Sequence, residues 1–202
     1  MQFRNVAIFS LAFMLISLTR PELSRAQSTV KFSTLSLALQ TIRQTYKIST
    51  GFDATSSDRD QTPITVDFSD QNIGDVFDSI ILQKPMYTWS FQDGVYDIYP
   101  KSEAESISGV YIVSYSVTEA TYPEASDAIA RLPEVQSWLS QNHVRRNEIK
   151  SSMGWSGTQK ISLTLNKVPL RNLLDQLTKK SGVEYWNIIR WGDKMQFIAI
   201  IF

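Results

Sequence analysis

Two segments of the sequence decide the fold: ITVDFSDQNIGDVFDSIILQKPMYTWSFQDGVYDI, residues 64–98, and ISLTLNKVPLRNLLDQLTKKSGVEYWNIIRWGDKMQFIAI, residues 161–200. An offset of 97 residues aligns Ile64 with Ile161 and keeps the apolar positions in step as far as Trp89 and Trp186. A three-residue insertion then restores the alignment of the last strand. One spacing governs some forty residues, so the chain contains an internal repeat.

Each copy predicts the order strand, helix, strand, strand. ITVDF and ISLTL alternate apolar and polar residues, which is typical of half-buried strands. Residues 70–84 and the stretch after Asn166 carry apolar residues at helical spacing. We expect Ser69 or Asp70 to cap the first helix and Asn166 to accept from the first amides of the second. Pro85 and Gly182 end these helices, and Asp93-Gly94 predicts a tight hairpin turn.

The flanking sequence extends both copies. A helix is expected from Leu35 to Tyr46, with Ser33 or Thr34 as its cap, followed by a short strand at residues 47–54. Before the second copy, residues 110–117 predict a strand and residues 128–139 a helical region interrupted at Pro133. Residues 141–160 are polar and are expected to form a loop. The fold class is therefore α+β, with two small layered units, each a short mixed sheet with helices packed on one face.

The N-terminal stretch predicts export. Arg4 precedes an apolar run at residues 6–18, which is too short for a transmembrane helix, and Ser24-Arg25-Ala26 resembles a cleavage site. We interpret residues 1–26 as a signal peptide cleaved after Ala26; a buried N-terminal helix and a retained anchor are the alternatives. The units are then assigned to residues 27–105 and 106–202, with the boundary within residues 101–108.

Composition excludes several classes of site. The chain has no cysteine and one histidine, His143, so thiol nucleophiles, cysteine-ligated metals and multi-histidine sites are excluded. Asp75 and Asp78 are expected on the wet face of a helix, and Asp93 and Asp97 beside a turn. No carboxylate pair is placed for acid–base catalysis. We therefore expect a protein that is not an enzyme, with no catalytic residues, no metal ligands and no cofactor.

The pattern resembles the secretin and TonB N-terminus short domain. The stretches that carry the resemblance are TLSLALQTIRQTYKISTGFDA and ITVDFSDQNIGDVFDSIILQKPMYTWSFQDGVYDIYP, within residues 34–100, and more loosely residues 161–202. Members of that family are periplasmic docking or signalling domains of secretion pores and outer-membrane transporters. The resemblance thus implies a periplasmic location and a partner in the envelope, such as an outer-membrane pore or receptor.

Charge suggests where a partner binds. Residues 27–140 carry a net charge of −8 and residues 141–202 of +6, so the halves attract each other or a second copy, unless the split is surface drift. The candidate partner contacts are Trp155, Arg145, Arg146, Lys179 and Lys180. Export argues against nucleic acid. Trp89 and Trp186 are interpreted as core aromatics, with sugar stacking as the alternative.

Together these patterns predict an exported envelope protein that acts as a protein–protein interaction or signalling module. It would serve as an accessory to a secretin or TonB-dependent system. The alternative is a periplasmic protein that binds a small molecule or glycan in an aromatic-lined cleft between the repeats. No transmembrane segment is expected after signal removal.

Overall fold

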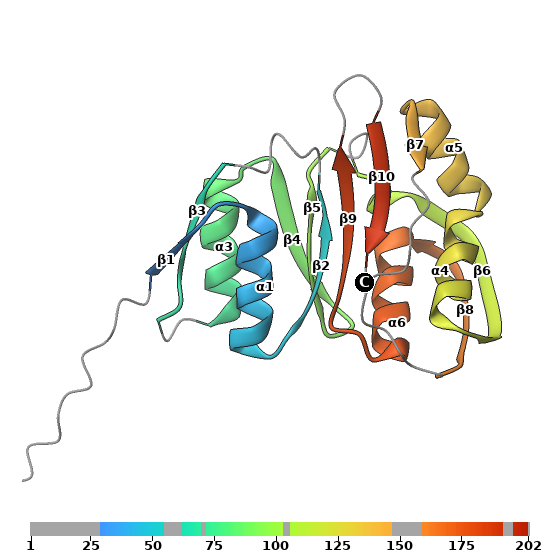
Figure 1. The fold of residues 1–202 in the computed structure, drawn as a ribbon, viewed down its shortest axis with the longest axis horizontal. Coiled ribbons are helices and arrows are strands. Elements are labelled where there is room, and N and C mark those ends of the chain that lie inside the picture. Colours follow the sequence, from blue (N-terminus) through green and yellow to red (C-terminus); the bar gives the residue numbers. More distant parts are fainter. Residues whose placement is uncertain are drawn as a thin grey trace, which may run out of the picture.

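The computed structural model describes residues 29–54, 62–69, 72–102, 106–146, 159–191 and 196–201, with the backbone alone at residues 145–146, 191 and 196–201. Figure 1 shows the α+β architecture. The first repeat consists of β1 (Thr29–Phe32), α1 (Leu35–Tyr46), β2 (Ser49–Asp53), β3 (Ile64–Asp67), α3 (Ile73–Gln83), β4 (Tyr87–Gln92) and β5 (Val95–Pro100). After the short helix η2 (Ile107–Gly109), the second repeat consists of β6 (Tyr111–Ala120), α4 (Tyr122–Ala130), α5 (Pro133–Gln141), β7 (Val144–Arg146), β8 (Ile161–Pro169), α6 (Leu170–Ser181), β9 (Tyr185–Trp191) and β10 (Gln196–Ile201).

The two repeats pair their strands in the same way. In the first, β1 pairs antiparallel with β3, β2 pairs parallel with β5, and β4 pairs antiparallel with β5. In the second, β6 pairs with β8, β7 with β10 and β9 with β10 in the same three orientations. The repeat therefore extends beyond the forty aligned residues, because β1, α1 and β2 correspond to β6, α4–α5 and β7. The predicted strand, helix, strand, strand order is confirmed in both copies.

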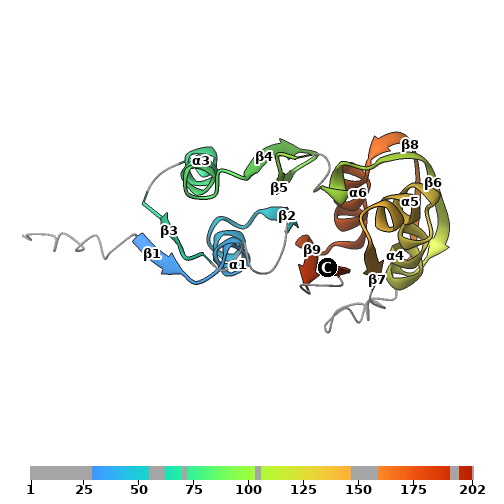
Figure 2. The ribbon, with the colours of Figure 1, turned by 90° about the horizontal axis from the view of Figure 1, so that it is seen from above.

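The two repeats share one sheet. Strand β2 of the first repeat pairs parallel with β9 of the second, which joins six strands in the order β4-β5-β2-β9-β10-β7. The register of this joint places Gly51 opposite Trp186 and Phe52 opposite Asn187. Figures 1 and 2 show β2 and β9 side by side at the centre of the molecule. The joint is thus a continuous sheet rather than a contact between two separate layers.

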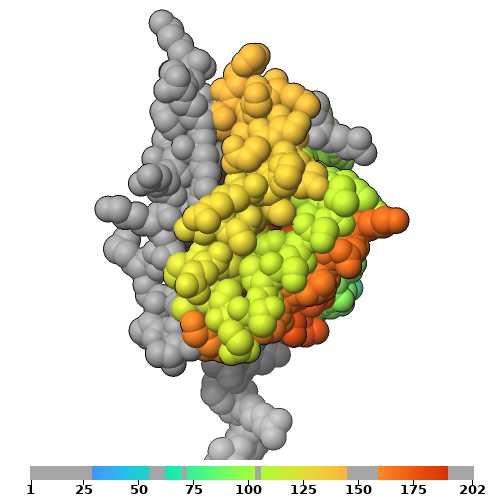
Figure 3. Space-filling model, turned by 90° about the vertical axis from the view of Figure 1, so that its right-hand side faces the viewer, coloured from blue at the N-terminus to red at the C-terminus, as the bar shows by residue number. Residues whose placement is uncertain are grey.

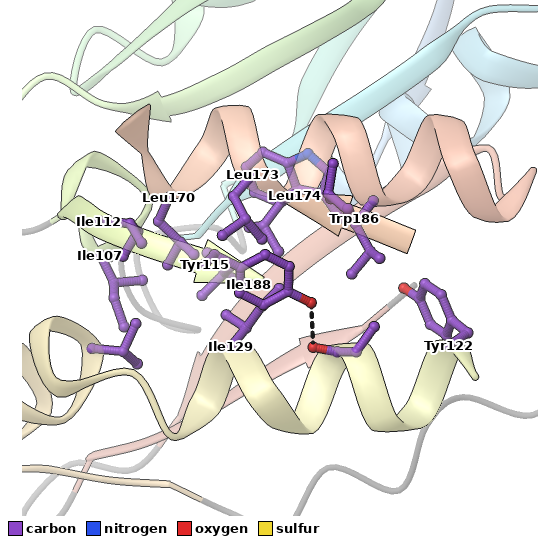
Figure 4. Close-up of a cluster of buried hydrophobic side chains, with 14 of the residues drawn as sticks. Ile107, Ile112, Tyr115, Tyr122, Ile129, Leu170, Leu173, Leu174, Trp186 and Ile188 are labelled. Carbon is purple, nitrogen blue, oxygen red and sulfur yellow. Dashed lines mark hydrogen bonds between the residues drawn. The ribbon is translucent and has the colours of Figure 1, made fainter. Parts of the chain in front are cut away.

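Each repeat keeps its own core, and the two cores lie on opposite faces of the shared sheet. Phe52 and Ile98 pack with α1 and α3, whereas Trp186 and Ile188 pack with α6. Consecutive residues of a strand lie on opposite faces of the sheet, so Phe52 and its neighbour Gly51 belong to different faces. Figure 2 shows α1 and α3 on one side of the sheet and α6 on the other, and Figure 4 shows the second core around Trp186. Helix α6 therefore packs against the sheet at the joint, near β2.

Local sequence explains most of the element ends. Thr34 caps α1, since its side chain accepts from the Leu37 amide, and Lys47 ends that helix with φ 54°. The β4–β5 hairpin turns at Asp93 and Gly94, whose φ values of 54° and 88° match the turn that Asp-Gly favours. Gly182 ends α6 in the left-handed region. These predictions are confirmed.

Three local predictions are wrong. Helix α3 is capped by Asn72, whose side chain accepts from the amides of Gly74 and Asp75, and not by Ser69 or Asp70. Strand β8 continues up to α6, so Asn166 pairs opposite Ser114 inside the strand and caps nothing. The polar stretch 141–160 contains β7, which pairs with β10. Such a strand is held by a partner distant in sequence, and its own residues show no apolar alternation.

Candidate functional site

Each repeat links a tryptophan on a strand to an aspartate on the preceding helix. The Trp89 Nε1–H of β4 donates to Asp78 Oδ1 of α3 over 2.8 Å. The Trp186 Nε1–H of β9 donates to Asp175 Oδ1 of α6 over 2.7 Å. Both residues shift by the repeat offset of 97. We call these contacts the first and the second Trp–Asp pair.

The spacing of eleven residues brings the two side chains level. Asp78 lies five residues before the end of α3, a rise of about 7.5 Å along a helix. Trp89 lies two residues into β4, about 7 Å along a strand. Because the chain reverses at Pro85, the carboxylate meets the indole N–H across the layer between helix and sheet.

The second Trp–Asp pair is buried in the joint between the repeats. Trp186 and Asp175 are both fully buried. Gly51 of β2 lies directly against the indole, and a Cβ at this position would overlap both the Trp186 ring and the Asp97 carboxylate. Only glycine fits here, so β2 can approach β9 closely enough to pair. The first repeat therefore closes over the pair in the second.

Two carboxyls share this joint. Asp97 of β5 lies beside Asp175, with 1% of its surface exposed. Burial raises the pKa of Asp97 well above its usual range, and the neighbouring Asp175 charge raises it further. Burial also raises the pKa of Asp175 to about 6, although the hydrogen bond from Trp186 acts to lower it. Arg171 favours the ionised form of both groups. Adjacent buried carboxyls cannot both ionise at low cost, so the pair holds one proton near neutral pH.

A buried ion pair fastens the same joint. Arg190 of β9 donates to Asp53 of β2 over 3.0 Å, and Asp53 also accepts from the Ser106 hydroxyl and the Ser108 amide at 3.0 Å each. Burial raises the pKa of Asp53, while Arg190 and the two serines oppose that rise. The contact joins a residue of the acidic half of the chain, Asp53, to a residue of the basic half, Arg190.

The joint is closed to a substrate. Asp53, Asp97 and Asp175 are each no more than 1% exposed, and acid–base catalysis needs the reacting group within hydrogen-bond reach of a substrate. Asp97 was expected beside the hairpin turn, and it lies there in β5, with its side chain toward α6. Among the residues described, no three His, Asp or Glu side chains form a group that could hold a metal ion. The buried charges therefore serve the joint itself.

A polar groove of about 270 Å³ lies between the repeats at α1 and β9. Arg43, Glu184 and Tyr185 are among its lining residues. The Arg43 guanidinium stacks 4.1 Å from the centre of the Tyr185 ring, which covers the aromatic face that a sugar would need. Ligand pockets are usually larger and mostly apolar. This groove gives little support to a glycan or small-molecule site.

A second groove, of about 460 Å³, lies on the outer face of the second repeat, with Val110, Pro133 and Trp138 in its lining. Figure 3 shows this face, where α4 and α5 lie beside β6 and β8. The Trp138 ring already receives the Arg190 guanidinium at 4.9 Å. It is therefore engaged in supporting the buried ion pair.

The first Trp–Asp pair lies at the rim of the molecule. Asp78 is exposed and Trp89 half-buried, and β4 ends the six-stranded order. Trp89 packs 5.5 Å from the centre of the Phe77 ring, and Phe91, 57% exposed, packs 4.4 Å from that of Tyr96. Within the described part of the chain, no strand pairs with the outer edge of β4. An aromatic row thus borders an open sheet edge.

The main chain of β4 presents unpaired groups at that edge. The Lys101 amide donates to the Met86 carbonyl over 2.9 Å, and Gln92 pairs with Val95 across the two-residue turn. The amides and carbonyls of the even-numbered residues of β4 therefore point toward β5, since main-chain groups alternate in direction along a strand. The amides and carbonyls of Trp89 and Phe91 point away from β5, toward solvent. This edge of β4, with the first Trp–Asp pair, is the candidate binding site.

The expected partner contacts are spread over the second repeat. Lys179 and Lys180 are exposed in the last turn of α6. Arg145 and Arg146 lie in β7, for which the backbone alone is described, and Trp155 lies outside the described residues. In Figure 1, β7 lies at the top of the view and α6 in its lower half. None of these residues lies on β4.

Sequence reasoning missed the two aspartates, although a signal was present. Across residues 64–92 the offset of 97 gives three identities: Ile64 with Ile161, Asp78 with Asp175, and Trp89 with Trp186. Two of the three identical positions bond to each other in each repeat. The prediction that Asp78 lies on the exposed face of its helix is confirmed, but it did not include the hydrogen bond from Trp89.

The chain matches no protein-family model, no curated protein and no solved structure. Within the described ranges, no helix has the length and apolar character needed to cross a membrane.

Proposed function

We propose that this chain is an exported, non-catalytic protein-binding module, and that it binds its partner at the outer edge of β4. The observation that carries the proposal is the difference between equivalent strands. Strand β9 has its Trp–Asp pair covered by a paired strand, β2, whereas β4 has the same pair and, among the described residues, no strand at its outer edge. A partner strand at β4 would complete the arrangement that the second repeat already has.

Strand addition would explain why this edge strand contains no charged residue and no proline. Natural proteins usually protect sheet edges with charged residues, proline or a covering element, because an open edge pairs with other chains. Here Phe91 is exposed at the edge, and the main-chain groups of Trp89 and Phe91 are unpaired within the described part of the chain. Main-chain hydrogen bonds give such sites affinity, and neighbouring side chains give them specificity.

The compartment belongs to the same proposal. The short apolar run and Ser24-Arg25-Ala26 support export, and the resemblance of residues 34–100 to the secretin and TonB N-terminus short domain supports a periplasmic partner. The partner would be an envelope protein, such as an outer-membrane pore or receptor. The burial of Asp97 and Asp175, which keeps both carboxyls out of reach of a substrate, supports a role without catalysis.

The test places a photo-crosslinking amino acid at Phe91 of the full chain, in cells that produce it naturally. Val113 of β6 is the matched control, since it is 59% exposed and lies in the second repeat. We expect one protein adduct at position 91 and none at 113. The captured protein, once purified, should bind the Phe91→Lys variant about tenfold more weakly than the wild type, and the Val113→Lys variant equally well. Equal binding by all three proteins would overturn the proposal.

A further inference from the structure

The outer edges of β4 and β9 present the same main-chain groups. In the joint, the carbonyls of Glu184 and Ile188 accept from the amides of Thr50 and Ala54 of β2, over 3.1 and 2.9 Å. The offset of 97 maps the Ile188 acceptor onto Phe91. The carbonyl of Phe91 faces away from β5 by the alternation described above. A strand that pairs with β9 therefore has the geometry to pair with β4.

The strand on β9 meets a strict steric condition. Gly51 is the residue opposite Trp186, and any Cβ at that position would overlap the indole. Trp89 occupies the equivalent place in β4, with its indole held toward the helix by the same hydrogen bond to an aspartate. The same condition therefore applies to a strand that pairs with β4.

We propose that β4 binds an extended segment of a partner protein that runs parallel to β4 and places a glycine opposite Trp89. This inference rests on the proposed function, and it adds the orientation and the sequence requirement of the bound segment. The segment would pair with the main chain of Trp89 and Phe91, as β2 pairs with Trp186 and Ile188.

A second copy of this chain does not supply such a segment. The element that corresponds to β2 in the second repeat is β7. Its described residues, Val144–Arg146, include no glycine. Strand β2, which has the glycine, is already paired on both sides, with β5 and with β9. The occupant is a different protein, and head-to-tail pairing of copies is an outcome that would overturn the inference.

The probe is a synthetic peptide with the sequence of residues 47–54, Lys-Ile-Ser-Thr-Gly-Phe-Asp-Ala, which already pairs in this manner with β9. It is titrated into the isotopically labelled full chain and followed by NMR. We expect saturable, weak binding that shifts the amides of Trp89 and Phe91 and the Trp89 indole N–H, but not the amide of Val113. A peptide with Gly51→Val should bind about tenfold more weakly, or not at all.

Orientation is read from spin labels on the peptide ends. In the parallel arrangement, an N-terminal label broadens the amide of Tyr87 and a C-terminal label that of Gln92. Three results would overturn the inference. They are the opposite broadening pattern, equal binding of the glycine and valine peptides, and a concentration-dependent dimer that Phe91→Lys abolishes. The captured partner could bind in a Phe91-dependent way while the valine peptide binds as tightly as the glycine peptide. In that case the proposed function stands, and the requirement for a glycine opposite Trp89 fails.

Discussion

The two Trp–Asp pairs have one chemistry in two surroundings. In the second repeat, β2 and β5 cover the pair, so Asp175 is fully buried and lies beside a second carboxyl. In the first repeat, the pair lies at an open edge and Asp78 is exposed to water. The same hydrogen bond is therefore part of a buried joint in the second repeat, whereas in the first repeat it lies at the surface of the molecule.

The surroundings also differ in their charges. Arg171 of α6 favours the ionised forms of Asp175 and Asp97, and its guanidinium stacks 4.6 Å from the centre of the Tyr99 ring. The repeat offset places Gly74 at the corresponding position of α3. Buried carboxylates need such compensation, whereas water solvates an exposed one. The arginine thus occurs only in the repeat whose pair is covered.

The largest contrast is expected from removing the indole N–H in each pair. Trp186→Phe should lower the free energy of unfolding by about 3 kcal/mol, because it leaves Asp175 Oδ1 without its donor and opens a cavity. Trp89→Phe should cost less than about 1 kcal/mol, since water replaces the lost donor at the exposed Asp78. Urea unfolding of the full chain measures both values. Equal losses would contradict the difference in burial on which the comparison rests.

Much of this could be predicted from sequence, and the limits have a physical origin. Helices, hairpins and the repeat follow from local periodicity, as for α1 with its Thr34 cap and the Asp93-Gly94 turn. The pairing of β2 with β9 does not, because it joins residues far apart, and no local pattern encodes which edge meets which. Asp97 and Gly51 have their roles only in that joint, so the sequence predicted a strand residue beside a turn and a residue of a short strand, without the contact between them.

A smaller effect is expected from the carboxyl pair, and it depends on pH. The raised pKa values mean that the folded protein binds more protons than the unfolded chain above about pH 4. Stability should therefore fall as pH rises from about 4 through 6 and beyond. Asp97→Asn removes one of the two charges and leaves an amide beside Asp175. It should stabilise the protein by about 1–2 kcal/mol at pH 8 and flatten the pH dependence.

The matched control for this prediction is Asp78→Asn in the first pair, which makes an Asp-to-Asn change at an exposed carboxyl and leaves the two buried carboxyls intact. The wild type and both variants keep Asp53, whose pKa is also raised by burial. The difference between the proteins in how stability changes with pH therefore reports on Asp97 alone. Chemical unfolding at pH 5 and pH 8 provides the measurement. A wild-type stability that rises between these values would contradict the shared-proton interpretation.

The smallest effect concerns the starts of the two equivalent helices. Asn72 and Pro169 are the N-caps of α3 and α6, again 97 residues apart, with nearly the same backbone angles: φ −67° and ψ 154° against φ −60° and ψ 149°. Only Asn72 offers a side chain that accepts from the first amides. Asn72→Ala should therefore cost about 1 kcal/mol, whereas Asn72→Ser keeps an acceptor and should cost less. In Pro169→Asn the new cap should offset the lost rigidity of proline, a change of less than about 0.5 kcal/mol. Thermal unfolding of the three variants decides the point: a loss in Asn72→Ser equal to that in Asn72→Ala would mean that the cap hydrogen bond does not stabilise α3.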